Sequence, residues 1–85
     1  GAKSKVWLAY AQLLAGELGN SEKTINEGLE TFQTMLAVDA TDISRQAEFS
    51  GALMIASVIY GENKKADEAL TALKQAESIL RPLRD

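Results

Sequence analysis

The sequence predicts an all-α domain of two stacked antiparallel helical hairpins, and three observations lead to that prediction. The 85 residues are 46% hydrophobic but only 6% aromatic, with a single proline, and much of the apolar content is Ala and Leu. Such a composition favours helices over sheets. Apolar residues recur at steps of three and four in four segments bounded by turn-forming residues, and the two pairs of segments are similar to each other.

The first helix is predicted at residues 4–18, with its apolar stripe at Trp7, Tyr10, Ala11, Leu14 and Leu18. The stretch GNSEK follows, in which Gly19 suits the left-handed position that ends a helix. Either Asn20 or Ser21 can cap the next helix. That second helix is predicted at residues 21–38, and its core face is formed by Ile25, Leu29, Phe32 and Leu36.

The third helix is predicted at residues 42–60, after a DATD break in which Thr41 or Asp42 can act as the cap. Its second half, ALMIASVIY, is apolar on almost every side, so we expect neighbours to enclose it at the centre of the domain. A strand is disfavoured there, because the chain offers no second strand to pair with it. The fourth helix is predicted at residues 64–81, and Pro82 is expected to end it.

An offset of 41 residues superposes the two hairpins without a gap. AQLLAG falls on ALMIAS, and INEGLETFQTM falls on ADEALTALKQA, so small residues meet small ones and large residues meet large ones. We expect the small residues to let helices approach closely, with Ala69 and Ala76 flanking Leu73 against the third helix, and Gly28 against the first.

This pattern resembles the tetratricopeptide repeat, a 34-residue helix-turn-helix unit. Residues 50–83 fit the pattern at Leu53, Ala56, Ser57, Tyr60, Ala69, Leu73 and Ala76. Residues 9–42 agree at Ala15, Gly16, Gly28 and Phe32, but have Gln12 and Gly19 at the bulky and aromatic positions. Because 41 exceeds 34, the central helix would be extended at its start by about two turns.

The resemblance implies that the first helix of each hairpin lines a face that binds a protein or peptide. The residues offered to that partner would be Tyr10, Leu13, Glu17, Met54 and Val58. Trp7 joins them, because Trp and Tyr often anchor protein interfaces. In an alternative interpretation, Trp7 and Tyr10 instead cover the core of the first hairpin.

Several classes of function are disfavoured by composition. The chain has no cysteine and no histidine, which removes thiolate nucleophiles, the commonest general base and the commonest metal ligands. Glu17, Glu27 and Glu30 are interpreted as a solvated face, so we predict no enzyme activity, no metal site and no cofactor. A net charge of −3 without clustered Lys and Arg disfavours nucleic acid. The longest apolar run is too short to span a membrane.

We therefore predict one helical domain at residues 1–85, with hairpins at residues 4–38 and 42–81, acting as a non-catalytic protein–protein interaction module. Two hairpins are fewer than such arrays usually need, so we expect a segment of a longer array, or an apolar edge covered by a homodimer or a partner subunit. The alternative is a small four-helix bundle, a structural or assembly factor that self-associates. The start at GAKSK, without an initiator Met or signal region, indicates no compartment.

Overall fold

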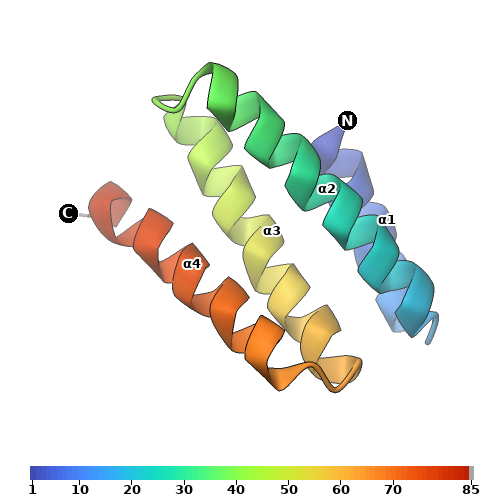
Figure 1. Cartoon of the computed structure of the whole chain (residues 1–85). Coiled ribbons are helices and arrows are strands. Elements are labelled where there is room, and N and C mark those ends of the chain that lie inside the picture. The colour runs from blue at the N-terminus through green and yellow to red at the C-terminus, as the bar shows by residue number, and fades with distance from the viewer. Residues whose placement is uncertain (85) are drawn as a thin grey trace.

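The computed structural model describes residues 1–84 and contains four helices in chain order (Figure 1). They are α1 (Ala2–Leu14), α2 (Leu18–Val38), α3 (Ile43–Glu62) and α4 (Ala66–Arg84). No strand occurs in the described part of the chain. Helix α1 packs antiparallel to α2, α3 packs antiparallel to α4, and α2 joins the two hairpins by packing on α3. The predicted all-α fold of two stacked hairpins is confirmed.

The stack of helices is open rather than closed. Within residues 1–84, α4 makes close backbone contact with α3 alone, whereas α3 also contacts α2 and, over a shorter length, α1. The molecule measures 35 × 25 × 17 Å along its principal axes, which corresponds to two layers of helices. Helix α3 therefore occupies the centre, as its apolar sequence predicts, and the four helices do not form a ring around a common core.

Both hairpin turns have the same backbone geometry. Gly16 in the first turn and Lys64 in the second have positive φ angles, of 81° and 62°. Each turn carries the paired backbone bonds of a Schellman motif. The N–H donors and their carbonyl acceptors are Glu17 to Gln12 (2.9 Å) and Gly16 to Leu13 (3.1 Å), then Lys65 to Tyr60 (2.8 Å) and Lys64 to Gly61 (3.0 Å).

The turns correspond at an offset of 48 residues, from Gly16 to Lys64, and not at the predicted 41. The difference of seven residues is about two helical turns, so an offset of 41 keeps the correct helix faces but displaces the turn. Gly16 lies in a turn, whereas Ser57, its predicted counterpart, lies inside α3. Gly19 was expected to end the first helix and instead lies in the first turn of α2.

Small residues occupy the helix crossings of both hairpins at this offset. The pairs are Ala9 with Ser57, Ser21 with Ala69, Thr24 with Ala72, and Gly28 with Ala76. A Cβ atom added to Gly28 would lie 3.2 Å from the Cβ of Lys5, which shows how closely α1 approaches α2. Ala76 is buried against α3 as predicted and Ala69 is half-buried. Leu73 was expected between them but is 47% exposed, because Ala72 takes the buried position.

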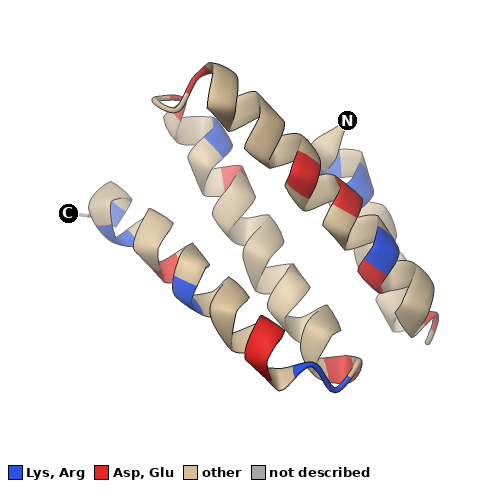
Figure 2. Ribbon diagram, in the orientation of Figure 1, with Lys and Arg blue, Asp and Glu red and all other residues tan. Residues whose placement is uncertain are grey.

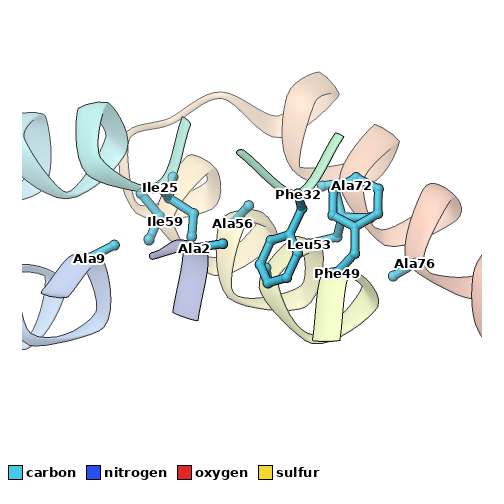
Figure 3. Close-up of a cluster of buried hydrophobic side chains, with 11 residues drawn as sticks. Ala2, Ala9, Ile25, Phe32, Phe49, Leu53, Ala56, Ile59, Ala72 and Ala76 are labelled. Carbon is cyan, nitrogen blue, oxygen red and sulfur yellow. The ribbon is translucent and has the colours of Figure 1, made fainter. Parts of the chain in front are cut away.

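The core runs along α3 and is shown in Figure 3. The rings of Phe32 from α2 and Phe49 from α3 lie 5.8 Å apart between centroids, and Ile25 and Ile59 are fully buried. Helix α1 contributes the small side chains of Ala2 and Ala9, which are buried. Val6 and Leu13 on the same side of α1 are partly buried and pack against the core. The predicted core stripe of α1, at Trp7, Tyr10, Ala11 and Leu14, is therefore wrong, because the close crossing selects the alanine side of the helix.

The predicted helix ends are partly correct. The side chain of Asp42 caps α3 by accepting a hydrogen bond from the Arg45 N–H at 3.0 Å. Ser21 is buried inside α2 instead of capping it, and its hydroxyl donates to the carbonyl of Ala9 at 2.7 Å. Helix α4 continues through Pro82, contrary to prediction. A proline in the last turn lacks the N–H that would donate to the backbone carbonyl of Ser78, four residues earlier. Ser78 is exposed, so water can hydrogen-bond to that carbonyl instead.

Candidate interaction surface

Helices α1 and α3 carry long uncharged segments that lie next to each other. Residues 6–16, covering most of α1, contain no Asp, Glu, Lys or Arg, and neither do residues 49–61 of α3. The two helices run in the same direction, and Figure 2 shows the uncharged length of α3 as an uninterrupted tan ribbon. Because residues 49–61 of α3 carry no charge on any side of the helix, any part of this segment left uncovered presents an uncharged, mainly apolar surface to solvent.

Two hollows separate α1 from α3. The hollow nearer the start of both helices has a volume of about 180 Å³ and is lined by Trp7 and Val6 on one side and by Gly51 and Ile55 on the other. The second hollow, of about 470 Å³, lies near the helix ends. Its lining residues include Leu13, Leu14, Leu18, Val58 and Glu62. The flank of α1 that carries Trp7 and Leu14 thus faces the α3 side.

Five large apolar side chains are exposed on this side of the molecule, and we call them the apolar face. Their exposed fractions are 66% for Trp7, 40% for Tyr10, 70% for Leu14, 44% for Met54 and 53% for Val58. The α1 members are spaced three and four residues apart and the α3 members four apart, so each set occupies one side of its helix. Single exposed apolar residues are ordinary, but a cluster on adjacent helices marks a binding surface.

The structure brings together four of the six residues predicted to bind a partner. Trp7, Tyr10, Met54 and Val58 belong to the apolar face, and the exposure of Trp7 contradicts the alternative in which it covers the core. Leu13 lies deeper, packed against the buried core while also lining the second hollow.

The sixth residue, Glu17, lies outside the apolar face at the turn before α2, where its carboxylate accepts a hydrogen bond from the Asn20 amide at 3.3 Å. Sequence reasoning missed Leu14, which was assigned to the core, and Ile55, which lines the first hollow. The charge-free run of residues 6–16 was the available signal, because it implies that apolar side chains outnumber the core positions of α1.

Charged residues stand at the two ends of the apolar face. At the end nearer the start of α1, Lys3 and Arg45 both contact Glu48, at 3.2 and 3.9 Å. At the opposite end stand Glu17 and Glu62, and neither lies within 4 Å of a cationic group in residues 1–84. The face is therefore uncharged in the middle, while the cluster of Lys3, Arg45 and Glu48 leaves one net positive charge at one end and Glu17 and Glu62 leave two negative charges at the other.

The other two carboxylates named from the sequence, Glu27 and Glu30, lie on α2. Glu27 accepts a hydrogen bond from the Lys5 ammonium at 2.9 Å, and this pairing lowers the pKa of Glu27 below its ordinary value. No group of three or more Asp or Glu side chains in the described chain is arranged to hold a metal ion. None of the helices in residues 1–84 has the length and apolar character needed to span a membrane.

A third hollow, of about 340 Å³, lies between α2 and α4 on the opposite layer. Leu29 and Leu53 contribute apolar lining, while polar residues such as Gln33 and Gln75 surround it. The Tyr60 hydroxyl donates to the Asn26 side chain nearby and links α3 to α2. The lining of this hollow is more polar than the apolar face, so it provides a matched location for control substitutions.

Comparisons with protein-family models, with curated proteins and with solved structures find no match for this chain.

Proposed function

We propose that this domain is a non-catalytic protein–protein interaction module that binds its partner through the apolar face. The observation that carries the proposal is the exposure of Trp7, Tyr10, Leu14, Met54 and Val58 on two adjacent helices with no charged residue among them. Tyr and Trp are enriched at the energetic centres of interfaces, and Met adapts its shape to different partners.

The position of this face supports a distant tetratricopeptide-like architecture, which we include in the proposal. In such an architecture the first helix of each hairpin lines the binding side, and α1 and α3 are those helices here. The second hairpin carries most of the resemblance, since its small residues Ala56, Ser57 and Ala76 are buried. The first hairpin departs from the pattern, because its turn falls at Gly16.

The open arrangement favours this proposal over a structural bundle. A closed bundle buries the apolar stripe of every helix against its other helices. Among the described residues α4 packs on α3 alone, and Trp7 is two-thirds exposed. A module of this kind gains stability by covering its exposed side with a partner.

Affinity capture from the source cells tests the proposal. Tagged protein with Trp7→Glu and Val58→Glu would place two charges on the apolar face, and the control would carry Gln33→Glu and Gln75→Glu at the hollow between α2 and α4. All four positions are exposed, so circular dichroism should show folded protein in both variants. We expect the control to retain the captured partner and the face variant to lose it. Equal capture by both variants would refute the proposed surface.

A further inference from the structure

We propose that the partner of the apolar face is a second copy of this chain, docked face to face around a twofold axis with the α1 helices antiparallel. This inference rests on the proposed function and names the partner for that same surface. Three properties of the face support it: its area, its lack of central charge, and the opposite charges at its two ends.

The area of the apolar face matches what one subunit contributes to an ordinary interface. From their exposed fractions, Trp7, Tyr10, Leu14, Met54 and Val58 present on the order of 500 Å² of apolar surface. In a standard-sized interface each partner buries about 800 Å², of which about 57% is non-polar, or about 450 Å². Self-docking would therefore cover these five side chains on both copies at once.

The uncharged centre makes pairing between identical faces favourable. Identical charged surfaces repel each other when they meet across a twofold axis, because like charges are brought together. Residues 6–16 and 49–61 contain no charge, so two copies bury no like-charged pair at the centre. A twofold interface also closes on itself, which limits assembly to a dimer.

The charges at the ends select the antiparallel arrangement. A twofold axis in the plane of the face can run along α1 and α3 or across them. Along the helices, it would place Lys3 and Arg45 against the same residues of the second copy. Across the helices, it places the cluster of Lys3, Arg45 and Glu48, which is positive by one net charge, near Glu17 and Glu62 of the second copy, which is favourable at an exposed interface rim. Each Trp7 then lies opposite Leu14 of the other copy, with Tyr10 and Val58 near the axis.

Disulfide cross-linking tests the geometry, because the chain has no cysteine of its own and each introduced thiol is unique. Val58→Cys lies near the proposed axis and should form a covalent dimer under mild oxidation of dilute protein. Gln33→Cys, exposed between α2 and α4, is the matched control and should remain monomeric. Trp7→Cys should also remain monomeric in the antiparallel arrangement, and rapid cross-linking of that variant would overturn the antiparallel geometry.

Sedimentation equilibrium tests the association itself. We expect unmodified protein to dimerise reversibly with rising concentration, and Val58→Glu to weaken the dimer by at least about 30-fold, as substitution at the centre of an interface does. A strict monomer would overturn this inference. If such a monomer still captured a cellular protein through Trp7 and Val58, the proposed function would stand. A dimer unaffected by Val58→Glu would place the contact elsewhere and overturn the inference.

Discussion

Replacing Gly28 by alanine tests the close crossing of α1 and α2, and Gly51 provides the matched control. Both glycines lie inside helices, where alanine is favoured over glycine by about 1 kcal/mol. An added Cβ at Gly51 meets no atom within 4 Å. At Gly28 it would lie 3.2 Å from the Lys5 Cβ and 3.6 Å from the Ala2 carbonyl oxygen. We therefore expect Gly51→Ala to stabilise the fold by about 1 kcal/mol.

For Gly28→Ala the same helical gain is opposed by contact with α1. The Lys5 Cβ is fixed to the helix backbone, so relief requires α1 to shift as a body and to loosen its packing at Ala2. Overpacking of this kind costs about 1 to 3 kcal/mol, so after the helical gain of about 1 kcal/mol the net change should lie between zero and about 2 kcal/mol of destabilisation. Urea unfolding at low protein concentration, followed by circular dichroism, gives both values. Stabilisation of Gly28→Ala equal to that of Gly51→Ala would refute the close crossing.

Three further predictions address the core, a buried hydrogen bond and the pH dependence. Phe32→Ala should cost about 3 to 5 kcal/mol, because the side chain is 1% exposed, and an unchanged urea midpoint would contradict its place in the core. Ser21→Ala should cost about 1 kcal/mol by removing the hydroxyl donor to the Ala9 carbonyl, measured by the same unfolding assay, and an unchanged urea midpoint would show that this hydrogen bond does not stabilise the fold. The hydrogen bond from Lys5 lowers the pKa of Glu27 in the folded state below its ordinary value of 4.5. The pair should therefore stabilise the fold above pH 4.5 and lose that contribution as the pH falls through the lowered pKa; thermal midpoints of Lys5→Met should fall less steeply with acid than those of the unmodified chain.

The fold could be predicted from sequence because α2 and α3 carry unambiguous signals. In α2 the large apolar residues at Ile25, Leu29, Phe32 and Leu36 occupy one side, and most of the other positions are polar. The apolar second half of α3 could be accommodated only at the centre of the packing. Thr41 and Asp42 were the two predicted caps before this amphipathic segment, and the structure shows that Asp42 is the one that caps α3.

The buried side of α1 could not be predicted in the same way. Both sides of residues 6–16 are apolar, so hydrophobic periodicity does not distinguish them. The volume of the side chains decides which side of α1 is buried. Gly28 and Ser21 on α2 leave room for close approach of the two helices, and Ala2 and Ala9 fit into that space better than Trp7 would. The same competition in α4 buries Ala72 and leaves Leu73 exposed.

Part of the candidate surface was nevertheless accessible from sequence. Tyr10, Met54 and Val58 were assigned through the family resemblance, and Trp7 through its chemistry, and all four lie on the apolar face. Leu14 was missed because it had been placed in the core. The offset of 41 residues was misleading for a physical reason: a shift of two turns preserves the sides of the helices, so only the backbone bonds at Gly16 and Lys64 reveal the correct register.

The attachment of α4 to a single neighbour sets the order in which the domain should open. In a linear stack, stability is divided between each unit and the units beside it, so a terminal helix can detach while the rest remains folded. Amide protons of α4 should therefore exchange with solvent before those of α2, which is held on both sides. Each such opening would expose the apolar side of α3 that α4 covers. Brief detachment of α4 is therefore the route by which heating would lead to aggregation.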